Sequence, residues 1–239
     1  MLISPQNLAE NLHSVRARIA AAALAAGRPA DCVTLVAVGK GHDADSVRAV
    51  AELGQRDFAE NYPQEGVAKI AAVRREGLCW HFIGQVQSNK TRLLAEHFDW
   101  VHGIDRAPIA ARLSAQRARY APPLNVCLQV KLAPEPDKAG VEPVRVASLA
   151  AEVAALPRLK LRGLMCIPPE TEDVAEQRRQ FRRMRQLLVE LNAAGYALDA
   201  LSMGMSGDFE AAIHEGATHI RIGTAIFGPR EGAGTQGER

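Results

Sequence analysis

Short apolar segments alternate with longer amphipathic segments along almost the whole chain. The apolar segments are rich in residues that suit buried strands, and we predict eight strands at residues 33–40, 57–62, 79–85, 100–105, 125–132, 159–167, 200–206 and 219–228. The amphipathic segments repeat their apolar residues with a period near 3.6, which predicts helices. These lie at about 44–54, 64–75, 87–97, 107–119, 143–155, 173–194 and 207–216, and a further helix near 5–26 precedes the first strand.

Strands that are apolar on both faces and separated by helices indicate a parallel sheet with both faces covered. Eight β/α units are what a closed (β/α)8 barrel, or TIM barrel, requires. We therefore predict an α/β fold with one TIM barrel and an extra N-terminal helix. A doubly wound open sheet is the alternative, and it needs one of the short strands to be a loop. We expect the barrel to span residues 1–229 and the Gly-rich segment 230–239 to be a flexible tail.

Composition and charge limit the classes of function that we expect for this protein. The chain has 29 Lys and Arg residues against 27 Asp and Glu, and this near-balance gives no general attraction to nucleic acid or anionic lipid. No apolar run approaches the roughly 20 residues of a membrane span. The N-terminal segment has no basic leader and is typical of an amphipathic helix, so we expect no signal peptide and a cytoplasmic protein.

We interpret the arginine-rich helix and the four cysteines as structural features and not as functional sites. The helix at 173–194 has an arginine-rich face in "EQRRQFRRMRQ", which we interpret as a solvated surface because no aromatic stacking residues interleave with the arginines. Its apolar face carries Phe181, Met184, Leu188 and Leu191. The cysteines are widely spaced, without a CxxC pair, so we expect reduced thiols and no metal site. They are Cys32, Cys79, Cys127 and Cys166.

Functional residues of a TIM barrel collect at the carboxyl ends of its strands. Those ends carry Lys40, Asn61, Gln85, Asp105, Lys131, Ser206 and the pair Gly223–Thr224. Lys40 ends a strand that is otherwise apolar. Burial disfavours an ammonium ion, so a buried lysine offers a neutral amine that can attack a carbonyl group. The alternative is a lysine that extends to water or pairs with a carboxylate.

The last two strand ends indicate an anion site. Ser206 precedes a predicted helix, and Gly223 and Thr224 lie in the last apolar segment. Backbone N–H groups beside glycines and at helix starts bind anions, and the loops after strands 7 and 8 often bind phosphate in TIM barrels. Ser206 could instead only cap a helix, and Gly223 could only form a turn. Together with Lys40, they suggest a ligand with an aldehyde and a phosphate, such as pyridoxal 5′-phosphate (PLP).

Seven stretches of the chain resemble the YggS/PROSC family of pyridoxal phosphate homeostasis proteins, which look like the barrel domain of alanine racemase standing alone. They are "LVAVGK", "FAENYPQE", "WHFIGQVQSNK", "DWVHGIDR", "DKAGV", "LRGLMCI" and "LSMGMSGDFEAAIHEGATHIRIGTAIFG". The resemblance covers nearly the whole chain in order. It implies that Lys40 forms a Schiff base with PLP, the implied cofactor.

The same resemblance implies roles for eight further positions. It implies phosphate contacts from Ser206, Gly223 and Thr224, with Met205 and Ile222 nearby. Arg221 is implied to reach the cofactor, at either its phosphate or its pyridine nitrogen. Asn61 is implied to lie beside the ring at the end of strand 2, and His81 to lie on strand 3 near the pocket.

Four features depart from the family pattern. The family usually has a "TKP"-like sequence after the lysine, and here "GHDAD" follows Lys40. Gly39 stands where the family usually has Ser, Ala59 replaces the Gly of "FGENY", and Lys131 replaces the Asn of "QVN". A second amine at Lys131 could compete with Lys40 for the aldehyde.

The resemblance implies a PLP carrier that acts in intracellular PLP homeostasis, without a defined reaction. We expect a monomer, with PLP-dependent enzymes as the candidate partners. The alternative is a PLP-dependent racemase or lyase of low activity. A racemase needs a second acid–base group on the opposite face of the cofactor, from a second domain and a partner subunit, and none of Tyr62, Tyr120 and Tyr196 is placed to replace it. An arginine at the pyridine nitrogen would also make the ring a poorer electron sink.

Overall fold

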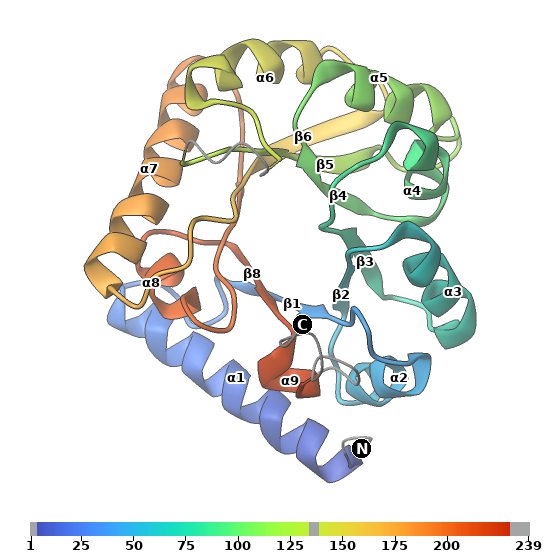
Figure 1. Ribbon diagram of the computed structural model, residues 1–239, viewed down its shortest axis with the longest axis vertical. Coiled ribbons are helices and arrows are strands. Elements are labelled where there is room, and N and C mark those ends of the chain that lie inside the picture. The colour runs from blue at the N-terminus through green and yellow to red at the C-terminus, as the bar shows by residue number, and fades with distance from the viewer. Residues whose placement is uncertain (1–3, 134–138, 230–239) are drawn as a thin grey trace, which may run out of the picture.

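Eight parallel strands pair in chain order and close on themselves when β8 pairs with β1 (Figure 1). The computed structural model describes residues 4–133 and 139–229, so the predicted tail at 230–239 lies outside the described residues. The strands are β1 (Thr34–Val38), β2 (Asp57–Glu60), β3 (Cys79–Phe82), β4 (Trp100–Ile104), β5 (Leu124–Gln129), β6 (Leu159–Met165), β7 (Ala200–Ser202) and β8 (His219–Ile222). The prediction of a TIM barrel is confirmed.

Helices surround the barrel (Figure 1), and their buried apolar residues belong to one core cluster with residues of the strands. They are α1 (Pro5–Ala25), α2 (Ala44–Glu52), α3 (Pro63–Val73), α4 (Thr91–His97), α5 (Ala107–Gln116), α6 (Val146–Ala154), α7 (Val174–Ala193), α8 (Phe209–His214) and α9 (Thr224–Phe227), with short 3₁₀ turns η1 (Ser88–Lys90) and η2 (Pro143–Arg145). Within the described ranges, none of these helices has the length and apolarity that crossing a membrane requires.

The extra N-terminal helix is confirmed, and it covers the point where the barrel closes. The Ser4 side chain caps α1 by accepting from the Asn7 amide, and Pro5 fits the first turn, where no amide partner is needed. Helix α1 packs against α8 and α9 (Figure 1). The Asn11 side chain donates to the main-chain oxygen of Ile226 in α9 at 3.0 Å. This contact ties the start of the described chain to the end of the barrel.

The last predicted strand, 219–228, is too long. Strand β8 ends at Ile222, and Gly223 accepts main-chain bonds from Ile226 and Phe227 as α9 begins. Ile226 and Phe227 are buried by this helix. A short apolar run has the same composition in a buried strand and a buried helix, so its pattern could not reveal the change.

The seventh predicted strand, 200–206, is also too long, because β7 ends at Ser202. Gly204 has a φ of +96°, which is outside the extended region. The predicted helix at 207–216 begins later, at Phe209. Residues 203–208 therefore form a loop at the mouth of the barrel.

The arginine-rich face of α7 is half exposed, as a solvated surface predicts, and it is also ion-paired. Arg178, Arg182 and Arg185 all approach the carboxylate of Glu215, which is buried, at 2.9 to 3.4 Å. On the apolar face Leu187 is buried, and Leu188, which the spacing predicts there, is only partly buried.

Gly163 permits β6 and β7 to approach each other closely. A Cβ atom at Gly163 would lie 1.8 Å from the main-chain oxygen of Ala200 in β7. We therefore expect Gly163→Ala to lower the free energy of unfolding by at least about 2 kcal/mol, because the two strands must separate.

Urea unfolding followed by circular dichroism measures this loss. Gly207→Ala is the matched control, since no heavy atom lies within 4 Å of a Cβ at Gly207. It should change the free energy of unfolding by less than about 0.5 kcal/mol. Equal stability of the two variants would contradict the close approach.

Candidate functional site

The carboxyl ends of β8, β1 and β2 lie side by side, because these strands are neighbours in the closed sheet. Lys40 follows β1, Asn61 follows β2 and Gly223 follows β8. The amide of Gly39 donates to the main-chain oxygen of Ala59 at 3.0 Å, which fixes the chain next to β2 just before Lys40. Three predicted site residues from distant parts of the sequence therefore share one part of the mouth.

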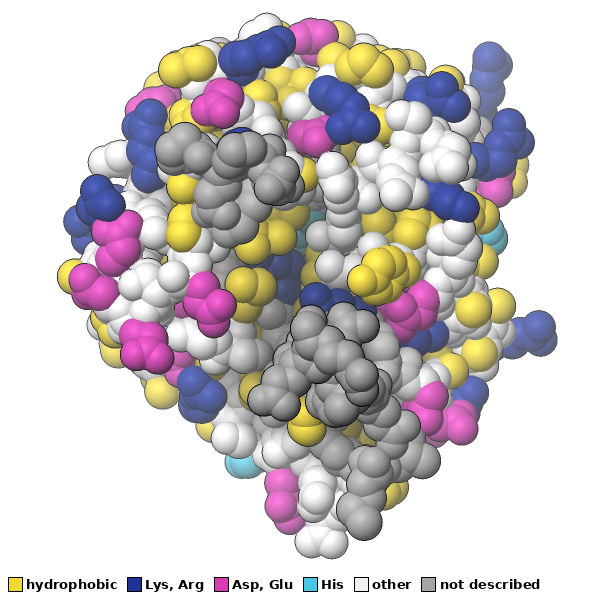
Figure 2. All heavy atoms as spheres, viewed as in Figure 1, with side chains coloured by type: hydrophobic (Ala, Val, Ile, Leu, Met, Phe, Trp, Pro, Cys, Tyr) yellow, Lys and Arg dark blue, Asp and Glu magenta, His cyan; other side chains and the backbone are white. Residues whose placement is uncertain are grey.

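Arg221 lies inside the barrel, on β8, and only 3% of it is exposed. Its guanidinium donates to the Ser202 hydroxyl at 2.7 Å and to the main-chain oxygen of Cys166 at 2.9 Å. Among the described residues, no carboxylate forms an ion pair with it. Burial lowers the pKa of Arg221, a sign that its charge is poorly compensated. Figure 2 shows Lys or Arg side chains at the bottom of the hollow in the centre of one face.

The residues predicted to contact phosphate lie in two adjacent segments of the mouth. Met205 and Ser206 are in the loop after β7, and the Met205 amide donates to the Asp208 carboxylate at 2.6 Å. Gly223 lies close to β1: a Cβ atom there would be 3.2 Å from the main-chain oxygen of Val38. Thr224, the next residue, is exposed at the first turn of α9, where helix amides have no intrahelical acceptor. These segments can offer N–H and O–H donors to an anion.

Ile222 differs from these residues because its side chain is fully buried in the apolar core. It can contribute only main-chain groups to a ligand at the mouth. Asn61 is half-buried, and its Oδ1 atom is buried without a hydrogen-bond partner among the described residues. A buried polar atom of this kind costs free energy unless a partner satisfies it, so Asn61 suits a ligand that donates a hydrogen bond.

His81 lies in the barrel interior on β3, stacked on the Trp100 ring with centroids 5.5 Å apart. Its Nε2 atom is 3.1 Å from the Asp57 carboxylate and 3.3 Å from the Cys79 sulfur. The ligand-type atoms of this trio lie within 4.8 Å of one another, and their mutual hydrogen bonds account for the geometry. Burial raises the pKa of the Cys79 thiol. All four cysteines are free, as predicted.

A hydrogen-bonded chain joins His81 to Arg221. His81 Nδ1 is 2.9 Å from His102 Nε2, and His102 Nδ1 is 2.7 Å from the Ser202 hydroxyl, which accepts from Arg221. Arg221 can only donate and an ionised Asp57 can only accept. Each bond is therefore satisfied when Ser202 donates to His102, His102 to His81 and His81 to Asp57. Burial lowers the pKa of His102 well below its usual value, which keeps it neutral in this chain.

Sequence reasoning missed His102 and Ser202 as partners of Arg221. In the sequence, His102 is one of several scattered histidines. The available signal was strand alternation, because Trp100 and His102 lie two residues apart on β4 and point to the same side.

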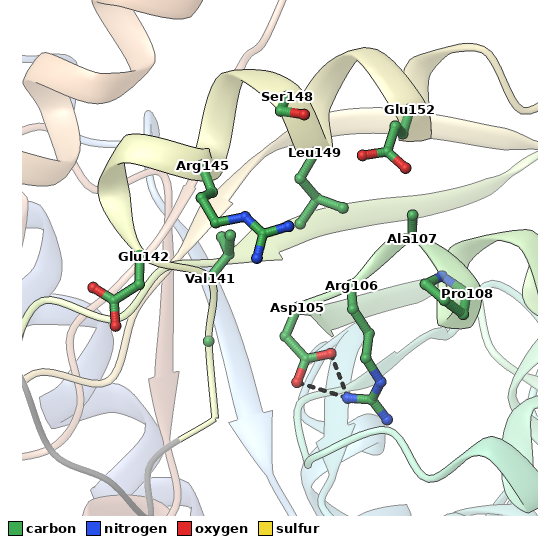
Figure 3. A pocket seen from close by; sticks show the side chains of 11 residues that line it. Asp105, Arg106, Ala107, Pro108, Val141, Glu142, Arg145, Ser148, Leu149 and Glu152 are labelled. Atoms are coloured by element: carbon green, nitrogen blue, oxygen red, sulfur yellow. Dashed lines mark hydrogen bonds and ion pairs between the residues drawn. The ribbon is translucent and has the colours of Figure 1, made fainter.

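Lys131 lies away from Lys40, because it follows β5, which is four strands from β1 around the closed barrel. Near that side, a cavity of about 320 Å³ separates the start of α5 from η2 and α6 (Figure 3). Asp105, another strand-end residue, pairs there with Arg106 at 2.7 Å, and Arg145 lies across the cavity. None of the nine predicted PLP-site residues lines this cavity.

Comparison with known proteins identifies the family. The model of the alanine racemase N-terminal domain matches residues 3–231. The pyridoxal phosphate homeostasis protein of Pseudomonas aeruginosa is 54% identical over 224 residues, which are 94% of this chain and 96% of the relative. The chain belongs to the YggS/PROSC family of pyridoxal phosphate homeostasis proteins. The family member of Escherichia coli K12 is 50% identical over 232 residues, covering 94% of this chain and 97% of its own.

Solved structures agree with this assignment. PipY of Synechococcus elongatus, solved with PLP bound, is 38% identical and has a TM-score of 0.82 over 92% of this chain and 100% of its own. An alanine racemase from Corynebacterium glutamicum has a TM-score of 0.70 at 16% identity, over 98% of this chain and 63% of its own. That second likeness shows the shared barrel fold alone.

His219, beside the stacked rings, should make stability depend on pH. Burial lowers its pKa from 6.5 to about 4. The unfolded chain therefore binds a proton in a pH range where the folded protein does not, and the free energy of unfolding falls as the pH falls from 6.5 toward 4. His219→Asn should remove roughly 2 kcal/mol of the loss between about pH 7 and pH 5.

The measurement is urea unfolding of both proteins across this range. His13→Asn, at an exposed position on α1, serves as the control and should follow the unsubstituted protein. If His219→Asn keeps the full acid slope, His219 is not buried as a neutral ring.

Proposed function

We propose that the protein binds PLP at the mouth of the barrel as a Schiff base on Lys40 and acts in intracellular PLP homeostasis as a carrier. The observation that carries this proposal is the buried Arg221 guanidinium, which lacks a carboxylate partner among the described residues and lies one strand from the strand end that bears Lys40. An anionic ligand at the mouth would compensate that charge. We expect a cytoplasmic monomer that exchanges PLP with PLP-dependent enzymes.

The predicted residues fit the parts of PLP. Amides and hydroxyls of Ser206, Gly223 and Thr224 suit the phosphate, and the unsatisfied Oδ1 atom of Asn61 suits a hydroxyl donor on the ring. Two related proteins support the choice of ligand: PipY was solved with PLP bound, and the relative in Pseudomonas aeruginosa is called a pyridoxal phosphate homeostasis protein.

Covalent capture needs a neutral amine and an aldehyde. Lys40 would hold PLP through its side-chain nitrogen, because an amine can condense with an aldehyde with loss of one water molecule. PLP supplies the reactive aldehyde and an electron-withdrawing ring. If Arg221 reaches the pyridine nitrogen rather than the phosphate, it cannot stabilise a protonated form of that nitrogen, because a guanidinium is a permanent hydrogen-bond donor. This property favours holding the cofactor over racemising a substrate on it.

Borohydride reduction of PLP-loaded protein, followed by peptide mass spectrometry, tests the attachment site. We expect a pyridoxyl adduct on Lys40 and none on Lys131. Lys40→Ala should lose the adduct, whereas Lys131→Met, the matched control, should keep it. An adduct confined to Lys131 would overturn the proposal.

The carrier role makes a separate prediction. Incubation of the PLP-loaded protein with single-enantiomer amino acids should leave their optical rotation unchanged, because no described residue has been placed as a second acid–base group. Loss of enantiomeric purity that disappears in Lys40→Ala would instead show a racemase.

A further inference from the structure

We propose that Lys69 is a positioning residue, which together with Glu60 and Glu65 holds the turn that carries Lys40 in the orientation that captures PLP. The inference rests on the proposed function, since it assigns a role in the same site. None of these three residues was identified from the sequence.

Lys69 is a buried cation with three acceptors. It projects from α3, and only 5% of it is exposed. Its Nζ atom donates to the main-chain oxygen of Gly39 at 2.6 Å, to Glu65 Oε1 at 2.7 Å and to Glu60 Oε1 at 2.9 Å. An ammonium group has three donors, so all of them are used here. One of the three bonds goes to the residue immediately before Lys40.

Glu65, which accepts from Lys69, also holds the residue after Lys40. The Gly41 amide donates to Glu65 Oε1 at 2.7 Å, and Gly41 has a φ of +74°, which favours glycine. The peptide groups on both sides of Lys40 are thus anchored, one through Lys69 and the other through Glu65. The main chain of Lys40 is fixed between two charge-assisted hydrogen bonds, and such bonds are stronger than neutral ones.

Lys40 also interacts electrostatically with this cluster, through Glu60. Glu60 is fully buried, and its Oε2 atom has no hydrogen-bond partner among the described residues. Burial raises the pKa of Glu60 to about 7, against the opposing effects of Lys69 and Lys40. Glu65 acts in the same direction as burial. A buried ionic cluster contributes little to stability compared with apolar residues of similar volume, so a role in the site explains its presence better.

Gly39, where the family usually has Ser, belongs to the same arrangement. A Cβ atom at this position would lie 2.7 Å from Glu60 Oε1 and 3.1 Å from Val47 Cγ2. Because Gly39 has no side chain, Glu60 and Lys69 can approach the turn this closely. The departure from the family pattern therefore permits tight contact between the cluster and the Lys40 turn.

The test compares capture of PLP by Lys69→Met with capture by the unsubstituted protein. Release of the Gly39 carbonyl should lower the rate of borohydride-trapped capture on Lys40 about tenfold or more. Arg117→Met is the matched control, because Arg117 is also a buried cation whose partners are main-chain oxygens, those of Ala95, Phe98 and Pro122. It should lose stability and still capture PLP at the normal rate.

Glu65→Gln gives a second measurement if Lys69→Met fails to fold. Glu65 is partly exposed, so its substitution should leave the fold intact, weaken the bond to the Gly41 amide and reduce the capture rate several-fold. A capture rate equal to that of the unsubstituted protein would overturn the inference.

A pH profile separates positioning from general stability. Glu60→Gln mimics the protonated carboxyl. The dissociation constant of this variant for PLP should therefore match that of the unsubstituted protein below pH 7. Above pH 7, where Glu60 is ionised in the unsubstituted protein, the dissociation constant of the variant should be the larger of the two. Identical profiles for the two proteins would overturn the role of Glu60 in the cluster. If the unsubstituted protein and Arg117→Met both fail to bind PLP, the proposed function itself fails, which is a distinct outcome.

Discussion

The pairing of β8 with β1 is the constraint on which the rest of the structure depends. It aligns Ala37 with Ile222, so the turn after β1 and the turn after β8 leave the sheet side by side. Lys40 and Gly223 are more than 180 residues apart in the chain and become neighbours only through this pairing. Helix α1 reinforces the closure by packing over α8 and α9. A break in this seam would separate the Lys40 amine from the segment at Gly223 that we predict to contact phosphate.

The alternation of apolar and amphipathic segments was sufficient to predict the barrel, because each unit must bury a strand under a helix. The strand ends then followed from topology, so the sequence alone could group Lys40, Asn61, Gly223 and Thr224 at one mouth. The ends of β7 and β8 could not be predicted well. There the chain leaves the sheet through main-chain geometry at Gly204 and Gly223, which composition does not encode.

The hydrogen-bond partners of the buried polar side chains were the other feature that could not be predicted from the sequence. Lys69 lies on a helix that is otherwise amphipathic, and nothing in its spacing indicates that three acceptors from two other segments and its own helix converge on it. Ser202 and His102 are likewise ordinary members of apolar strands. Their partners come from strands distant in sequence, so only the closed barrel reveals which polar groups satisfy one another. His81 belongs to this set, since its contacts are with Asp57 and His102 in the interior.

The chain of bonds from Asp57 to Arg221 runs through the interior of the barrel from the amino-terminal ends of the strands towards the mouth. Arg221 at one end can only donate and an ionised Asp57 at the other end can only accept, so the direction of every bond between them is fixed. Loss of the acceptor at Asp57 would leave these directions unfixed, and it would change the electrostatic environment of the guanidinium at the other end. Sequence comparisons within the family should treat these positions as one co-varying unit.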